Sequence, residues 1–211
     1  MKILGFMGSP RVKGLNAQLI ASALKGAESR GAATGRYDLI KCNIRYCTGC
    51  FRCLFENHEL PFGICSLKDD MAGILKDYCE ADGYILSTPV YDVGMTALMK
   101  TFIERKFPLF FKDREDTVTL PAARRPALFL KKGALFVTAN ARDEYREVMG
   151  DPTFEALEYD FMIEQVEVIE KLYVGGAHVM TEEKLAGHLN EAYAIGARLV
   201  EAIEGARSAQ G

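Results

Sequence analysis

The sequence contains no apolar run of the roughly 20 residues that a membrane-spanning helix needs. Its N-terminus, Met1–Met7, leads into glycine and serine without a long apolar leader segment or a small-residue cleavage site. The formal net charge is only −3, so the strong basic footprint of a nucleic-acid-binding protein is also missing. We therefore expect a cytoplasmic protein with neither a membrane nor a nucleic acid as partner. The ordinary balance of 49% hydrophobic and 26% charged residues predicts one globular domain over 1–211.

Two common nucleotide-binding motifs are also missing from the first predicted strand–helix junction. The turn Gly8-Ser9-Pro10-Arg11-Val12-Lys13-Gly14 has neither the Gly-Lys-Ser/Thr of a P-loop nor Gly-x-Gly-x-x-Gly. It nevertheless lies between a buried strand, 3–7, and a helix predicted from Leu15, where free backbone N–H groups and the helix dipole favour an anion. Ser9 and Asn16 add neutral donors, and Arg11 adds a guanidinium suited to phosphate.

The cysteines, in contrast, are concentrated in one segment. Five of the six fall between Cys42 and Cys65, and Cys47, Cys50 and Cys53 follow one another at two-residue intervals. This spacing places three thiolates around one corner of an iron–sulfur cluster, with Cys65 or Cys42 as the fourth ligand. Free or redox-active thiols and a zinc site are the alternatives, since closely spaced cysteines in a reducing compartment bind metal or do redox chemistry.

Strand and helix patterns alternate along the chain. Apolar runs predict strands at 3–7, 37–42, 83–88, 127–139 and 168–175, the fourth of them irregular at 131–133. Helical spacing predicts helices from Leu15, at 69–79 after a capping box at 66–69, and at 95–107, 153–166 and 181–204. This order predicts a doubly wound, five-stranded parallel sheet with helices on both faces, a cysteine-rich loop at 42–65 and an excursion near 111–126. Such folds bind ligands at the carboxyl ends of the strands.

Together these motifs resemble the flavodoxin-like NAD(P)H-dependent FMN reductases, especially their iron–sulfur flavoprotein branch. The resemblance extends from Met1 to about Arg105, through the following segments: Gly8-Ser9-Pro10-Arg11 with Asn16, the Cys47–Cys53 run with Cys65, Asp69-Asp70-Met71, Ala81-Asp82-Gly83, Pro89-Val90-Tyr91 and Lys100–Arg105. The chain departs from the family pattern at three places: Ala17 replaces a hydroxyl residue, Glu104 replaces aspartate, and Thr138-Ala139-Asn140-Ala141 replaces a glycine-rich turn.

The resemblance implies an FMN site and a metal site. The flavin phosphate would contact the turn residues Ser9, Arg11, Gly14, Asn16 and Ala17. The isoalloxazine ring would lie against Pro89, Val90, Tyr91, Asp92, Val93 and Gly94, with Thr138 and Asn140 as further candidates. A [4Fe–4S] cluster would be held by Cys47, Cys50, Cys53 and Cys65.

The activity implied is that of an FMN-dependent oxidoreductase or electron-transfer flavoprotein. FMN would take electrons from NAD(P)H or a redox-protein donor and pass them to a small-molecule or protein acceptor, so no catalytic side chain is expected. The alternatives are a cluster-free NAD(P)H-dependent FMN or quinone reductase, a flavodoxin-like electron carrier and a zinc-stabilised module. The family also implies a homodimer or homotetramer, for which we expect the aromatic stretch 107–111 to supply contacts.

Overall fold

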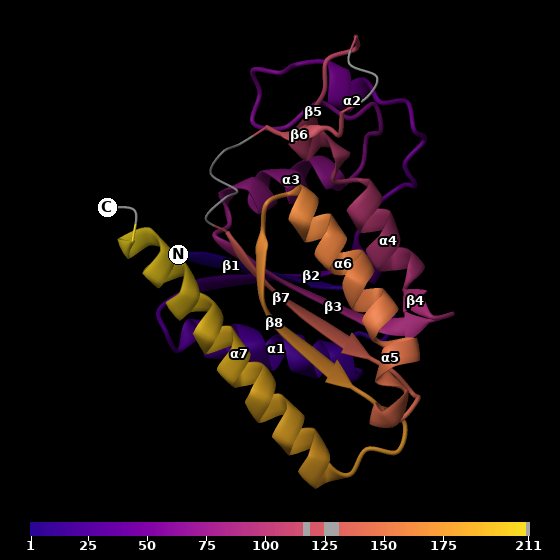
Figure 1. Cartoon of the computed structure of the whole chain (residues 1–211), viewed down its shortest axis with the longest axis vertical. Helices are drawn as coiled ribbons and strands as arrows, with labels where there is room; N and C mark the ends of the chain where they lie inside the picture. Colours follow the sequence, from indigo (N-terminus) through magenta and orange to yellow (C-terminus); the bar gives the residue numbers. More distant parts are fainter. Residues whose placement is uncertain (116–118, 125–130, 210–211) are drawn as a thin grey trace.

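Five parallel strands form the centre of the structure, a computed structural model that describes residues 1–115, 119–124 and 131–209. In spatial order they are β2 (Ala33–Asp38), β1 (Lys2–Met7), β3 (Gly83–Tyr91), β7 (Lys132–Thr138) and β8 (Glu167–Val174) (Figure 1). A short β4 (Gly94–Met95) folds back antiparallel on the end of β3. The predicted doubly wound sheet is confirmed, and its carboxyl edge gathers the turns that follow β1, β3, β7 and β8.

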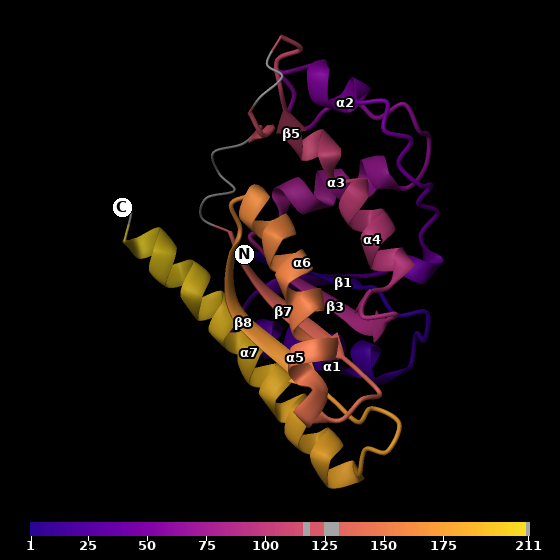
Figure 2. The ribbon, with the colours of Figure 1, turned by 45° about the vertical axis from the view of Figure 1, so that its right-hand side comes forward.

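Helices cover both faces of this sheet (Figure 2). One face packs against α1 (Leu15–Glu28) and α7 (Glu182–Ser208), and the other against α3 (Met71–Glu80), α4 (Ala97–Glu104) and α6 (Asp151–Ile163). Short helical turns complete the chain: η1 (Leu39–Lys41), α2 (Arg52–Phe55), η2 (Phe107–Leu109), η4 (Asp143–Tyr145) and α5 (Arg146–Met149). The hydrophobic core is therefore divided into two layers by the sheet.

Two glycines allow α1 and α7 to pack closely. A Cβ added to Gly26 would lie 1.9 Å from the carbonyl oxygen of Tyr193, and one added to Gly196 would lie 1.8 Å from the carbonyl oxygen of Ala23. Neither distance is compatible with a side chain at those positions, so the contact requires glycine on both helices. The helix α1 begins directly after residues 8–14, which we call the phosphate turn because a phosphate is predicted to bind there. The packing of α1 against α7 therefore also fixes this turn relative to the sheet.

The cysteine-rich segment forms a separate layer beyond α3, at the top of Figure 1. We call residues 42–68 together with the hairpin of β5 (Phe110–Phe111) and β6 (Ala122–Ala123) the cysteine lobe. The stretch 107–111, expected to supply subunit contacts, enters this lobe, and its Leu109 and Phe110 are buried within the same chain. Most of its apolar surface is thus already used for internal packing.

Several predicted boundaries were wrong. The second strand is Ala33–Asp38 rather than 37–42, since residues 39–41 form η1. The capping box at 66–69 does not form, and Asp70, the N-cap of α3, makes no side-chain cap bond. The Asp69 carboxylate accepts the backbone N–H groups of Arg45 and Met71 and pairs with the Arg105 side chain. The third predicted helix ends at Glu104, and Pro108 belongs to η2.

The fourth predicted strand is confirmed from Lys132 to Thr138, with a register irregularity between Gly133 and Ala134 against β8. Residues 127–130 of that prediction lie outside the described residues. In the part of the chain that the structure describes, no helix combines the length and the apolar character that crossing a bilayer requires.

Candidate functional site

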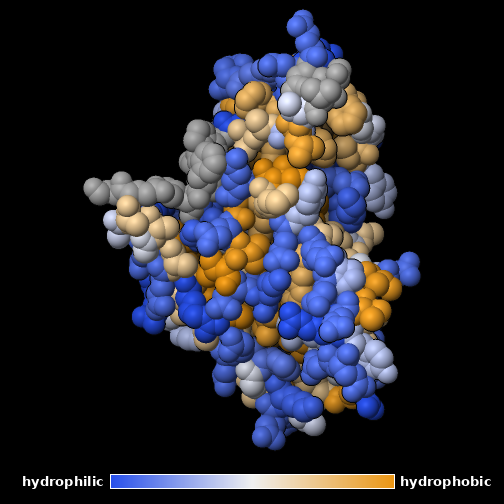
Figure 3. All heavy atoms as spheres, in the orientation of Figure 1, coloured by the Kyte–Doolittle hydropathy of each residue, from blue (hydrophilic) through white to orange (hydrophobic). Residues whose placement is uncertain are grey.

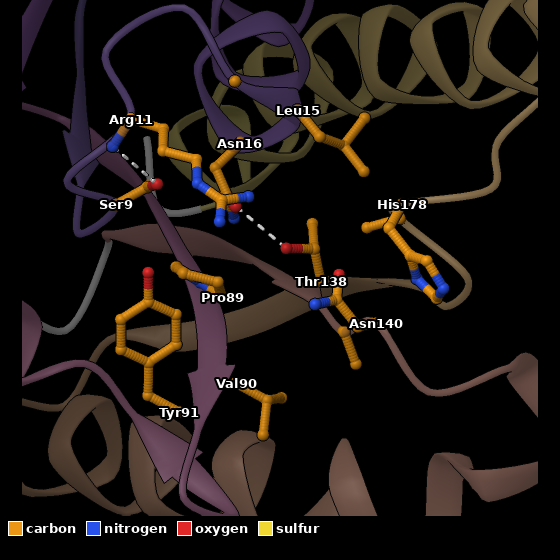
Figure 4. Close-up of a pocket in the computed structure, with 13 residues that line it drawn as sticks. Ser9, Arg11, Leu15, Asn16, Pro89, Val90, Tyr91, Thr138, Asn140 and His178 are labelled. Atoms are coloured by element: carbon orange, nitrogen blue, oxygen red, sulfur yellow. Dashed lines mark hydrogen bonds between the residues drawn. The ribbon is translucent and has the colours of Figure 1, made fainter.

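A cavity of about 280 Å³ opens at the carboxyl edge of the sheet (Figure 4). Its walls come from the turns after β1, β3, β7 and β8, the place where a doubly wound sheet binds ligands. The lining residues are Ser9, Arg11, Gly14, Leu15, Asn16, Pro89, Val90, Tyr91, Thr138, Ala139, Asn140, Ala177 and His178.

The start of α1 supplies the anion-binding end of this cavity. Gly14 is the N-cap and makes no side-chain cap bond, and the first helical bond runs from the Gln18 N–H to the Gly14 carbonyl (3.1 Å). The N–H groups of residues 15–17 therefore precede the helical ladder at the positive end of the dipole. Ser9 Oγ accepts the Arg11 N–H (3.1 Å) and keeps its own hydrogen to donate, while the Arg11 guanidinium points into the cavity (Figure 4). These donors fit a phosphate monoester such as that of FMN.

The end of β3 forms the opposite wall through Pro89, Val90 and Tyr91, and a tight turn to β4 follows it. Tyr91 pairs with Gly94, and the two residues between them, Asp92 and Val93, both have positive φ angles, 48° and 59°. This is the geometry of a type I′ hairpin turn, which normally selects asparagine and glycine. Val93 in this conformation costs on the order of 1–3 kcal/mol. Tyr91 and Val93 at this turn are half-exposed, and Figure 3 shows hydrophobic surface at the right-hand edge of the molecule, where Figure 1 places β4.

Most of the predicted flavin contacts meet in this cavity. Ser9, Arg11, Gly14, Asn16, Pro89, Val90, Tyr91, Thr138 and Asn140 line it, whereas Ala17, Asp92, Val93 and Gly94 do not. His178, which has no partner nearby in the sequence, lies across the cavity from Ser9 and Arg11 (Figure 4). Its position directly after the strand at 168–175 is the signal that could have identified it, because that strand ends at the same edge of the sheet.

A second cavity, of about 370 Å³, lies in the cysteine lobe. All four predicted ligands, Cys47, Cys50, Cys53 and Cys65, line it, together with Lys100 and Glu104 of α4 and the Phe107 ring. Cys42 and Cys79 are not among its lining residues. Within the described ranges, no three His, Cys, Asp or Glu side chains already stand in a metal-binding arrangement. The lobe thus brings the four thiols around one space, and the donor set suits iron–sulfur ligation.

The thiols of this cavity differ in acidity. The backbone N–H of Arg52, followed by the Ser66 hydroxyl, lowers the pKa of Cys50. Burial, followed by the proximity of Cys65, Cys47 and Cys50, raises the pKa of Cys53 to about 11. Deprotonation of Cys53 is therefore favoured by a compensating positive charge, which a bound metal would supply.

A buried ion pair joins the two ends of the cysteine lobe. Arg105 Nη1 lies 2.5 Å from Asp69 Oδ2 and 2.6 Å from the Arg45 carbonyl, while Nη2 lies 3.0 Å from Asp69 Oδ1 and 3.6 Å from Cys65 Sγ. Asp69 also accepts the N–H of Arg45 (2.9 Å). Arg105 therefore fixes both Cys65 and the segment that leads into Cys47, and it places a positive charge beside a ligand sulfur.

Arg124, from the β5–β6 hairpin, holds the middle of the lobe. Its guanidinium donates to the backbone carbonyls of Cys53 (2.9 Å), Glu56 (2.8 Å), Asn57 (2.5 Å) and Phe110 (2.8 Å). These carbonyls include those at the end of α2, where a cation is favoured by the helix dipole. Arg124, which falls within the excursion predicted near 111–126, thus holds the backbone of the cysteine lobe in place.

The two cavities lie at opposite ends of α4 and share no lining residue. Thr96, the N-cap of α4, donates its hydroxyl to the carbonyl of Gly8 (2.6 Å) beside the flavin cavity, whereas Glu104 at the other end lines the cysteine cavity. At 1.5 Å per residue, the eight residues of α4 span about 12 Å. Within one chain, the phosphate turn and the cysteine quartet are therefore not in contact.

Solved structures of similar fold define the class of protein. An NAD(P)H:quinone oxidoreductase from Methanothermobacter marburgensis superposes with a TM-score of 0.71 at 16% identity, over 94% of this chain and 98% of that one. A flavone reductase superposes with a TM-score of 0.68 at 23% identity, over 97% of this chain and 63% of that one. At these identities the likeness establishes the flavodoxin-like fold.

Sequence relatives establish the family. Residues 1–150 match the NADPH-dependent FMN reductase family, to which this chain therefore belongs. An iron-sulfur flavoprotein of Archaeoglobus fulgidus is 30% identical over 204 residues, which cover 97% of this chain and 81% of that protein. An iron-sulfur flavoprotein of Methanocaldococcus jannaschii is 38% identical over 109 residues, or 52% of this chain and 53% of its own length. The family predicted from the sequence is confirmed, and with it the class of FMN-dependent oxidoreductase.

Proposed function

We propose that this protein takes electrons from NAD(P)H at an FMN bound in the carboxyl-edge cavity and carries a [4Fe–4S] cluster on Cys47, Cys50, Cys53 and Cys65. FMN, when bound, supplies two-electron chemistry, and a cluster supplies one-electron transfer. The observation that carries the proposal is that the four cysteines line one cavity in a chain of this family. The residues around each cofactor therefore bind, orient and tune it.

The roles of the flavin-site residues follow from their positions. Arg11, Ser9 and the N–H groups at the start of α1 would bind the phosphate, while Pro89, Val90 and Tyr91 would pack against the ring. The remaining predicted contacts, Ala17, Asp92, Val93, Gly94, Gly14, Thr138 and Asn140, would contribute backbone groups or shape.

The cysteine lobe would direct electrons to the acceptor. Cys47 and Cys50 are exposed, so a cluster at this cavity would lie close to solvent and to an incoming protein or small molecule. Arg105 beside Cys65 would offset the negative charge that four thiolates bring. The acceptor, the choice between NADH and NADPH, and the homodimeric or homotetrameric assembly belong to this proposal as family expectations.

The test is to mix the FMN-loaded protein with NADPH, and separately with NADH, without oxygen. We expect the visible flavin band to bleach with one of the nicotinamides, because the chain belongs to the NADPH-dependent FMN reductase family. If dithionite bleaches the band but neither nicotinamide does, the protein is an electron carrier with a protein donor. The proposed NAD(P)H-dependent reductase activity would then be wrong.

A further inference from the structure

The side chain of Asn16 lines the carboxyl-edge cavity and makes hydrogen bonds to two buried hydroxyl groups. It is 4% exposed, and its Nδ2 donates to Ser87 Oγ (3.1 Å), while its Oδ1 accepts the hydroxyl of Thr138 (2.8 Å). Ser87 and Thr138 are themselves buried. Figure 4 shows the bond between Asn16 and Thr138 across the floor of the cavity. We call Asn16, Ser87 and Thr138 the Asn16 brace.

Each member of the brace belongs to a different wall of the cavity. Asn16 is in the first turn of α1, Ser87 is in β3 two residues before the Pro89 wall, and Thr138 ends β7 directly before Ala139 and Asn140. The bonds join positions 71 and 122 residues apart in sequence. The amide is therefore the link through which the phosphate turn, the ring wall and the turn after β7 keep fixed relative positions.

The brace is also costly to break. Turning the amide toward a ligand would remove the partner of the Thr138 hydroxyl, and a buried polar group left without a partner costs more than the bond itself contributed. The amide orientation is thus set by the protein before any ligand arrives, which is the arrangement expected of a preorganised site.

We propose that Asn16 is a positioning residue, which acts on the flavin through Ser87 and Thr138 and couples the phosphate end of the cavity to the ring end. This differs from the phosphate contact that the family resemblance implies for its side chain. The proposal rests on the proposed function, since it requires a flavin in the carboxyl-edge cavity.

The experiment compares binding of FMN and riboflavin, which share the ring and differ by the phosphate, to the purified protein by flavin fluorescence. A positioning role predicts that Asn16→Ala weakens both ligands by the same factor, about tenfold, because the ring wall and the phosphate turn loosen together. Thr138→Val removes only the hydroxyl and should weaken the binding of both ligands equally. When it is combined with Asn16→Ala, it should cause little further loss of affinity. Thr138→Ser, which keeps the hydroxyl, should recover the affinity.

Arg11→Gln is the contrasting variant, because loss of a phosphate-binding guanidinium should weaken FMN and leave riboflavin nearly unchanged. If Asn16→Ala shows that same FMN-selective loss, its side chain binds phosphate and the positioning role is wrong. The positioning role would also be wrong if Asn16→Ala and Thr138→Val reduced the affinity independently, so that the double variant showed the product of the two single losses. If Asn16→Ala does not fold, Thr138→Val and Thr138→Ser decide by the same comparison. A wild-type protein that binds neither flavin overturns the proposed function itself.

Discussion

Cys65→Ser is expected to reduce the iron and acid-labile sulfide of the anaerobically purified protein to background while leaving its FMN content unchanged. Cys65 is the one proposed ligand outside the Cys47–Cys53 run, and its Sγ lies 3.6 Å from Arg105 Nη2 at the cavity that the run also lines. Metal–thiolate bonding contributes on the order of 10 kcal/mol in small thiolate sites, so removing one of four ligands is a large loss. FMN should remain because the two cavities share no residue.

Cys79→Ser is the matched control, since Cys79 lies on α3 and is not among the residues that line the cysteine cavity. We expect this variant to keep the iron and sulfide content of the natural sequence. Iron retained in full by Cys65→Ser would show that the ligand set is different. Stoichiometric zinc, or no metal at all in the unsubstituted protein, would favour the alternatives of a zinc site or free thiols.

Lys106→Met is expected to destabilise the fold by about 3–5 kcal/mol at pH 8. The Lys106 ammonium is fully buried and lies 2.5 Å from Asp160 Oδ2 and 2.5 Å from Glu164 Oε1, while Glu164 also accepts the hydroxyl of Tyr78. Methionine fills a similar volume but leaves two buried carboxylates without their counter-ion. Urea unfolding measures the loss, and Lys41→Met is the control because Lys41 is exposed and its ion pair with Asp38 should contribute under about 1 kcal/mol.

The loss at Lys106 should depend on pH. Burial raises the pKa of Glu164 from 4.5 to about 7 in the folded protein, and Lys106 opposes that rise. A carboxyl group with a raised pKa favours the folded state below its unfolded pKa, and this contribution is lost as pH rises from 4.5 through 7. At pH 5 Glu164 is largely protonated, so Lys106→Met should cost less there than at pH 8. Adding Glu164→Gln to this variant should reduce the difference, and an equal cost at both pH values would contradict the account.

The order of elements could be predicted from the sequence because buried parallel strands are continuous apolar runs, and helices show one apolar stripe. The second strand was misplaced for the same reason. It is the outer strand β2, pairs only with β1, and is half-buried over most of its length, so Ala33–Asp38 is not an apolar run. The apolar Leu39 and Ile40 that attracted the prediction belong to η1.

Some residues of the candidate site could likewise be predicted from the sequence, and others could not. The positions of Ser9 and Arg11 in a turn, and of Pro89 near the end of β3, could be predicted because motif and topology place them at one edge of the sheet. The role of Asp69 could not, because its local contact with the Met71 N–H is joined by an ion pair with Arg105, which lies 36 residues away in the sequence. The contact between Asn16 and Thr138 likewise joins residues 122 positions apart, a separation that no local pattern encodes.

The visible absorption spectrum of the protein purified without oxygen, with its FMN and iron determined on the same sample, tests the central claim most directly. We predict flavin bands superimposed on a broad shoulder that dithionite bleaches, from FMN in the carboxyl-edge cavity and a cluster on the cysteine quartet. Clean flavin bands without iron would contradict the cluster and leave a cluster-free reductase. A colourless protein that cannot be loaded with FMN would contradict the account as a whole.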